Sequence, residues 1–127
     1  MAATAAGEGQ QVSWDDAVWL LEPVDVAALL PVPSRWRRYD HQDFTCWTFD
    51  GERWLINVCD WEPIDDLAEV PDRVRQLLPR VGYLISIGME PINPSRAGWA
   101  FLNRVIAALA TGSHGLGFDV FTGEPIR

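Results

Sequence analysis

The sequence contains no lysine, and all ten of its basic residues are arginines. Schiff-base chemistry needs a lysine amine, so this class of covalent catalysis is excluded for the chain. A phosphate-binding P-loop is excluded as well, because its lysine contacts the phosphates of the nucleotide. The missing residue type therefore removes two common groups of enzymes.

Cysteine is also scarce, since Cys46 and Cys59 are the only two. They do not form a C-x-x-C pair, and a structural zinc site needs more ligands at recognisable spacing. No apolar run approaches the roughly 20 residues that span a bilayer. Segment Met1–Gln11 has neither the basic nor the apolar region of a signal peptide. We therefore expect no metal, no cofactor, no membrane partner, a cytoplasmic location and reduced thiols.

The residues that are present indicate one globular domain. The chain has 127 residues, of which 48% are hydrophobic, and its seven tryptophans supply large pieces of a core. We expect a disordered tail at residues 1–11 and a single domain at residues 12–127. The net charge of −8 repels the phosphates of nucleic acids. It suits a basic protein partner, although it can also serve solubility alone.

The N-terminal part of the domain predicts short elements. Ser13, with Asp15 and Asp16 in the first turn, resembles a helix start, but the apolar run at residues 17–21 fits a helix and an edge strand equally well. Asp25 is a candidate cap for a short second helix that stops at Pro31. Residues 35–39 then form a basic and aromatic segment.

A hairpin is predicted next, because two β-prone runs flank Asp50-Gly51. A two-residue loop at this dipeptide, or a four-residue loop around it, gives the strands the same two faces. Cys46 and Cys59 fall on the outer face without being directly opposite in either register, so no disulfide is expected. The predicted core face holds Trp47, Phe49, Trp54, Ile56 and Val58.

Strands and helices alternate in the second half of the chain. The pattern predicts a helix after Pro71, a strand at residues 83–90, a helix at residues 95–111 ending at Gly112, and a strand at residues 116–121. The order is β-β-α-β-α-β after an N-terminal helical or mixed segment. We therefore expect an α+β fold, a small sandwich of a mostly antiparallel sheet with helices on one face.

Three groups of residues could carry chemistry or bind a nucleic acid. His41 and Cys46 could form a nucleophile pair, but no third group orients them and no glycine-rich turn offers an oxyanion hole. His114 and Asp119 could pair, whereas a histidine after a helix is also favoured there by the helix dipole. Residues 35–39 could stack on a nucleic acid, or their arginines could pair with nearby carboxylates. We expect no catalytic residue.

Acidic residues are concentrated in residues 60–72, which contain no base. Their spacing matches no calcium-binding loop. They can present a negative patch to a basic protein, with Trp61 as an aromatic anchor, or form a solvated loop. The six acids are Asp60, Glu62, Asp65, Asp66, Glu69 and Asp72.

The segment from Tyr83 to Pro125, about a third of the chain, resembles a pattern found in bacterial immunity proteins that accompany polymorphic or secreted toxins. It consists of a strand that starts Tyr-Leu-Ile-Ser-Ile and ends near Glu90, a helix, and a return strand that opens at Gly115 and closes with Asp119 and Thr122-Gly123. The helix contributes Leu102, Ile106, Ala107 and Leu109 to the pattern.

The resemblance implies a non-enzymatic antitoxin-like protein in bacterial competition. Such an inhibitor binds a cognate toxin, encoded nearby, and blocks its active site by protein–protein contact. These families share no catalytic residues. The expected contact residues are therefore inferred from the charge and the aromatic character of the segments described above. The alternatives are a small enzyme and a domain that binds a small molecule or a nucleic acid. The expected partner-binding residues are Trp61, Glu62, Asp65 and Asp66, with Arg37 and Tyr39 as a second patch.

Overall fold

The structure of the protein, a computed structural model, describes residues 13–91 and 94–127. The expected tail at residues 1–11 lies outside this part of the chain. The elements, in which η marks a short 3-10 helix, are β1 (Trp14–Leu20), α1 (Val26–Leu29), η1 (Pro33–Arg35), β2 (Trp36–Asp40), β3 (Thr45–Asp50), β4 (Leu55–Cys59), β5 (Glu62–Pro63), η2 (Leu67–Glu69), α2 (Asp72–Leu77), β6 (Tyr83–Glu90), α3 (Arg96–Ser113), β7 (Gly117–Phe118) and β8 (Pro125–Ile126).

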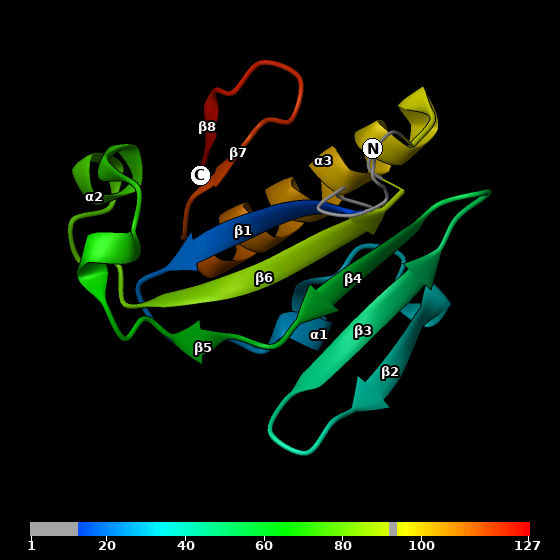
Figure 1. The fold of residues 1–127 in the computed structure, drawn as a ribbon, viewed down its shortest axis with the longest axis horizontal. Helices are drawn as coiled ribbons and strands as arrows, with labels where there is room; N and C mark the ends of the chain where they lie inside the picture. Colours follow the sequence, from blue (N-terminus) through cyan, green and yellow to red (C-terminus); the bar gives the residue numbers. More distant parts are fainter. Residues whose placement is uncertain (1–12, 92–93) are drawn as a thin grey trace, which may run out of the picture.

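One antiparallel sheet organises the fold (Figure 1). Its strands follow the order β1-β6-β4-β3-β2, and β5 also pairs with β6. Each of the strand pairings described in this sheet is antiparallel. The predicted α+β class with a mostly antiparallel sheet is therefore confirmed.

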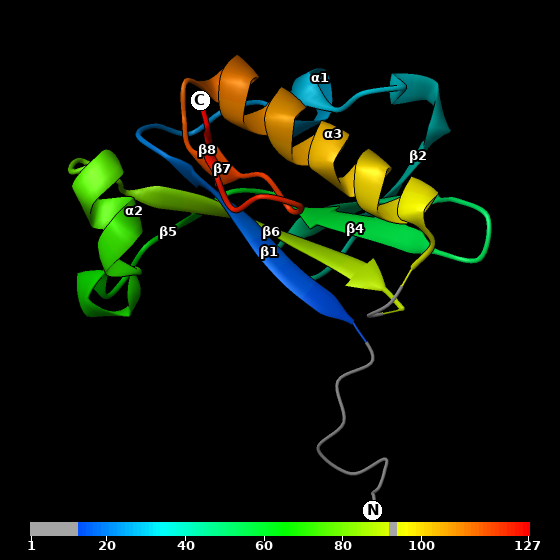
Figure 2. The ribbon, with the colours of Figure 1, turned by 90° about the horizontal axis from the view of Figure 1, so that it is seen from above.

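Helix α3 covers one face of the sheet, and α1 lies against α3 on the same side (Figure 2). Strand residues that point toward α3 are buried together with the apolar stripe of that helix. Four of the residues predicted for the core face of the hairpin are among the buried ones: Trp47, Phe49, Ile56 and Val58. A smaller cluster forms around α2 from Val70, Val74, Leu78, Val81 and Leu116.

The β3–β4 hairpin has the predicted faces but a later turn. Asp50 pairs with Leu55, so the loop consists of the four residues 51–54. The N–H of Gly51 donates to the carbonyl of Trp54 across 2.8 Å, which closes the loop. The turn is therefore centred two residues beyond the Asp50-Gly51 dipeptide.

The side chain of Trp54 accounts for this displacement. Its ring stacks on Phe49 with 5.9 Å between centroids and packs against Gly98 of α3, so the residue leaves the strand to fill space beside the helix. The register moves by an even number of residues, which preserves the faces. Cys46 and Cys59 now lie directly opposite each other, so the prediction that they do not face each other is wrong.

The open choice at residues 17–21 is resolved in favour of a strand, and the predicted helix start at Ser13 is wrong, because strand β1 begins at Trp14. β1 pairs with β6 on one side and forms an edge of the sheet. Its other edge is partly covered, since the N–H of Trp19 donates to the carbonyl of Leu116. The N–H of Ala17 points the same way and donates to the carboxylate of Asp16 across 2.8 Å. The helix alternative fails because pairing with β6 supplies the backbone hydrogen bonds.

The short helix after Asp25 is confirmed, with that carboxylate as its cap. The long helix is also confirmed and begins after Ser95. Its C-cap, however, is His114 in the left-handed conformation and not Gly112. Gly112 has a different role, because a β-carbon there would lie 2.7 Å from the Leu29 side chain of α1. The glycine thus allows close packing of two helices.

The predicted strand at residues 116–121 is only partly present. β7 is short and pairs with β8 in a separate two-stranded ribbon, so it does not join the main sheet. The chain turns at Asp119, whose carboxylate accepts the N–H groups of Phe121 and Thr122. These local hydrogen bonds compete with strand pairing and stop the strand.

Candidate protein-docking site

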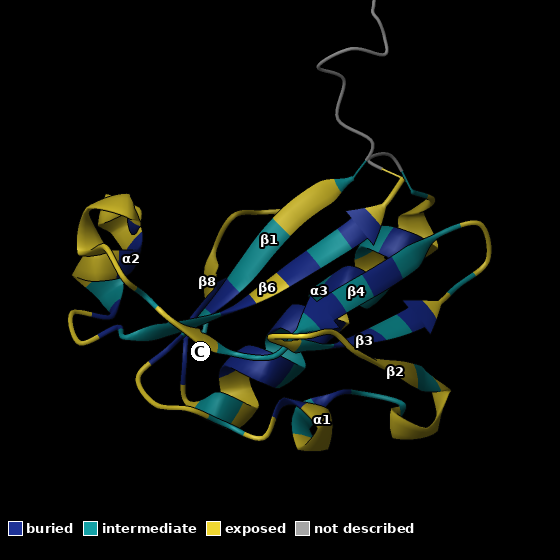
Figure 3. Cartoon of the chain, turned by 60° about the horizontal axis from the view of Figure 1, so that its bottom comes forward, coloured by how far each residue is buried: buried dark blue, intermediate teal, exposed yellow. Residues whose placement is uncertain are grey.

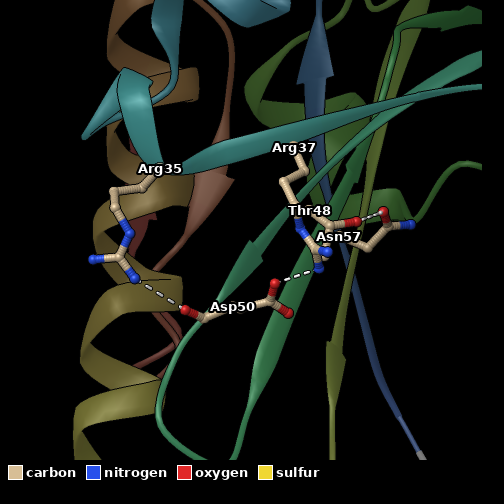
Figure 4. Close-up of polar contacts among 5 residues, drawn as sticks. All are labelled: Arg35, Arg37, Thr48, Asp50 and Asn57. Carbon is tan, nitrogen blue, oxygen red and sulfur yellow. Dashed lines mark hydrogen bonds and ion pairs between the residues drawn. The ribbon is translucent and has the colours of Figure 1, made fainter.

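The middle of the sheet face that points away from α3, formed by β3, β4 and β6, carries short and polar side chains. Figure 1 views the sheet from this side, with α3 behind it. Thr48 on β3 donates a hydrogen bond to Asn57 on β4 across 3.0 Å (Figure 4). Ser86 and Gly88 of β6 lie on the same face by strand alternation. These four residues are therefore not part of the main core cluster.

Two hollows lie side by side at one end of this face. The first, which we call the β5 hollow, has a volume of about 230 Å³ and is lined by Trp19, Glu62, Pro63, Ile64, Asp65, Asp66, Glu69, Val70 and Leu84. The second, the Phe44 hollow, has a volume of about 380 Å³ and is lined by Asp43, Phe44, Cys59, Asp60, Trp61, Glu62, Pro63 and Ser86. They share Glu62 and Pro63. We call the two hollows together the acidic surface.

The acidic surface brings together the first predicted patch. Glu62 lies in β5 and is common to both hollows, Trp61 lines the Phe44 hollow, and Asp65 and Asp66 line the β5 hollow. Figure 3 shows that the segment around η2 is largely exposed. The Trp61 ring is half-buried and meets Tyr83 edge to face, with 5.5 Å between centroids. Packing therefore holds this anchor in one orientation.

Phe44 is a member of the surface that sequence reasoning missed. Its side chain is 52% exposed, and its ring stacks on His41 with 4.5 Å between centroids. The only sequence signal was its place on the outer face of the hairpin. An exposed aromatic pair at the rim of a hollow is a feature of protein-binding surfaces.

The second predicted patch lies on β2, the other edge of the sheet. Arg37 forms an ion pair with Asp50, and Arg35 donates to the carbonyl of Asp50 across 3.2 Å (Figure 4). The guanidinium of Arg37 also lies 5.7 Å from the centre of the Tyr39 ring. The charge of Arg37 is thus offset within the sheet.

Tyr39 connects this patch to the acidic surface. It pairs with Cys46, which in turn pairs with Cys59 in the wall of the Phe44 hollow. Tyr39 therefore lies on the same face of the sheet as that hollow, and its side chain is 43% exposed. Asp65 and Asp66 lie beyond Glu62, so the predicted residues form a band and not one compact cluster.

Two other tryptophans, Trp36 and Trp14, lie outside both hollows. Trp36 donates its indole N–H to the carbonyl of Pro31 across 2.6 Å, and its ring packs near Phe49 and Phe101. It is therefore a structural residue. Trp14 is 39% exposed and meets Trp99 edge to face.

The structure does not bring the catalytic candidates into contact. His41 stacks on Phe44, whereas Cys46 is buried opposite Cys59. Asp119 accepts a hydrogen bond from Asn103, and with the backbone N–H groups of its turn this lowers the pKa of its carboxyl. Across residues 13–91 and 94–127, no hydrogen bond joins either histidine to its proposed partner, and no three potential metal ligands cluster.

Comparisons with protein families, with curated proteins and with solved structures find no match to this chain. Within the described residues, no helix is both long and apolar enough to cross a membrane.

Proposed function

We propose that the protein binds a basic protein partner through the acidic surface, and that it is an immunity protein that neutralises a cognate bacterial toxin by covering its active site. The observation that carries the proposal is the combination, in two adjoining hollows, of carboxylates with aromatic side chains. The acids are Asp43, Asp60, Glu62, Asp65, Asp66 and Glu69.

Charge supports a basic partner. Neither hollow includes an arginine or a histidine among its described lining residues. The negative potential is therefore not neutralised locally, and the chain as a whole carries a net charge of −8. Such a field accelerates encounter with a positively charged protein.

The aromatic residues supply what the charges do not. Rim carboxylates mainly raise the association rate, whereas buried aromatic anchors slow dissociation. Phe44 is exposed and Trp61 half-buried on the same hollow. A partner that covers both side chains would bury apolar area beside the carboxylates.

The second part of the proposal states that the basic partner is a bacterial toxin. It rests on the resemblance of the C-terminal third, where β6 and α3 occupy the expected strand and helix positions. Inhibition by blockade requires a surface and no catalytic group. The acidic surface is compatible with that requirement.

The test is binding to the product of the adjacent gene, measured by calorimetry and by association kinetics at two salt concentrations. We expect a one-to-one complex of nanomolar affinity that weakens as salt rises. The triple variant Glu62→Gln/Asp65→Asn/Asp66→Asn should associate about tenfold more slowly at low salt. Phe44→Ala should instead raise the dissociation rate by about tenfold or more.

A matched control separates local from global charge. The variant Glu22→Gln/Glu52→Gln/Glu124→Gln removes the same charge from exposed positions outside both hollows. It should retain most of the association rate. If both triple variants lost the same fraction of the association rate, net charge alone would explain the effect and the acidic surface would have no special role. No heat at high micromolar concentration would reject this partner.

A further inference from the structure

Cys46 and Cys59 form a directly opposed pair across β3 and β4. The N–H of Asp60 donates to the carbonyl of Thr45 across 2.8 Å, so the hydrogen bonds flank the cysteine pair and do not join it. In such a non-hydrogen-bonded pair the Cα atoms are about 4.5 Å apart and the side chains approach closely. This separation lies within the range that a disulfide spans, about 4.4–6.8 Å.

The two thiols are free and in mutual contact. Cys46 is 3% exposed, whereas Cys59 is half-buried and opens into the Phe44 hollow. The side-chain amide of Asn57 lies 3.7 Å from the sulfur of Cys59. One thiol is therefore accessible from solvent, and the other lies directly behind it.

We propose that Cys46 and Cys59 are a covalent modification site, a dithiol that closes into a cross-strand disulfide within the folded protein. The oxidant is a low-molecular-weight disulfide. The thiolate of Cys59 attacks one of its sulfurs, a mixed disulfide forms, and one small thiolate leaves. The thiolate of Cys46 then attacks the sulfur of Cys59, the protein disulfide forms, and the second small thiolate leaves.

The exchange is balanced. The two cysteines lose two electrons and two protons in total, and the small disulfide is reduced to two thiols that carry those protons. Only the thiolate form of cysteine attacks. Burial, contact with Cys46 and the negative charge of Glu62 raise the pKa of Cys59 to about 12. Closure is therefore slow at neutral pH and accelerates as the pH rises.

Carboxylates surround the opening through which Cys59 is reached. Glu62, whose charge helps to raise the pKa of that thiol, lines the Phe44 hollow together with Asp43 and Asp60. They also slow the approach of an anionic oxidant such as glutathione disulfide. Raising the salt concentration should therefore speed closure as well.

The experiment incubates the reduced, folded protein with excess glutathione disulfide at neutral and at mildly alkaline pH, followed by acid quenching and alkylation. Cleavage after arginine separates the cysteines, because Cys46 lies in peptide 39–53 and Cys59 in peptide 54–73. We expect the intact mass to fall by two hydrogens and the two peptides to be joined. The oxidised protein should keep its circular dichroism spectrum and melt several degrees higher, since the bond closes a loop of about 14 residues.

Two variants identify the order of events. Cys46→Ser should stop at the mixed disulfide and gain one glutathione on Cys59, whereas Cys59→Ser should gain little because Cys46 is buried. A stable glutathione adduct on the wild-type protein, without joined peptides, would overturn the proposal. So would joined peptides that appear only in denaturant. Wild-type protein that keeps both thiols reduced at the alkaline pH would likewise overturn it. These wild-type readouts decide the matter even if a variant folds poorly.

Discussion

At the scale of the residue, Asp16 combines a structural use with an energetic cost. Its carboxylate accepts the N–H of Ala17 and the indole N–H of Trp14, and so covers a backbone donor at the open edge of β1. Burial nevertheless raises the pKa of Asp16, because desolvation of the charge outweighs the two hydrogen bonds. Folding therefore makes this carboxyl easier to protonate than it is in the unfolded chain.

This predicts that Asp16→Asn stabilises the protein at neutral pH. A folded-state pKa above the unfolded value gives a stabilising contribution that is present below about pH 3.8 and is lost as the pH rises through the folded pKa. Asparagine keeps an acceptor without the charge. We expect the melting temperature of the variant to exceed that of the wild type by a few degrees at pH 7 and to equal it near pH 3. A lower value at pH 7 would mean that the hydrogen bonds need the full charge.

Single residues also show where sequence reasoning stops. Trp54 was predicted to lie on the core face of the hairpin, and its ring does pack against the core. The residue itself, however, lies in the turn and not in a strand, because its ring packs against Gly98 of α3, far away in the sequence. The same register places Cys46 opposite Cys59. Phe44 and Trp36 differ in exposure although both are aromatic residues beside the hairpin. The local alternation of apolar and polar residues predicts which side chains share a face of a strand. It does not predict the contacts between distant residues that shift the register of the strand.

At the scale of the element, the β7–β8 ribbon is held to the sheet by a narrow attachment. Leu116 exchanges two backbone hydrogen bonds with Trp19, at 2.8 and 2.9 Å. Gly115 precedes this bridge, and a β-carbon there would lie 2.3 Å from the carbonyl oxygen of Trp19. The attachment therefore requires glycine, because the obstructing atom belongs to the backbone.

Gly115→Ala should consequently detach the ribbon from β1. We expect a loss of stability of about 1–3 kcal/mol, typical of an overpacked site, and faster amide hydrogen exchange at Trp19 and Leu116. Gly88→Ala is the matched control, since a β-carbon there meets nothing within 4 Å on the uncovered face. It should be neutral or stabilising by up to about 1 kcal/mol. Equal effects of the two variants would refute the steric explanation.

The elements that sequence predicts well are those whose signal is local. The strand at residues 83–90 and the helix from Ser95 have clear periodicity, and α1 has its aspartate cap. β1 could not be separated from a helix, because its identity comes from pairing with β6, whose residues lie 63 to 75 positions later in the chain. The last strand was too long in the prediction, since the Asp119 turn was not recognised in the sequence.

At the scale of the whole molecule, charge is the dominant feature. The net charge is −8, so the carboxylates repel one another across the molecule. Three ion pairs in the described part of the chain act in the stabilising direction, and they join Arg37 to Asp50, Arg38 to Asp40 and Arg75 to Asp72. Exposed pairs contribute little to stability. Mutual repulsion of the carboxylates should therefore exceed their effect.

We expect salt to stabilise the folded protein at pH 7. Raising ionic strength from about 0.01 M to 0.15 M shortens the screening length from about 30 Å to about 8 Å, which weakens repulsion across the molecule. The melting temperature should rise by a few degrees, and the gain should shrink near pH 4.5, where the net charge approaches zero. A melting temperature that falls with salt would show that the ion pairs dominate.

The one-sided placement of α3 has a consequence for divergence. Most of the buried apolar residues lie between that helix and the sheet, so folding depends mainly on one half of the molecule. Substitutions at exposed positions on the opposite half, such as Glu62 and Asp65, should therefore have little effect on stability. Under the proposed function, lineages of this protein would acquire new partners by altering a few such residues while the same scaffold is inherited unchanged.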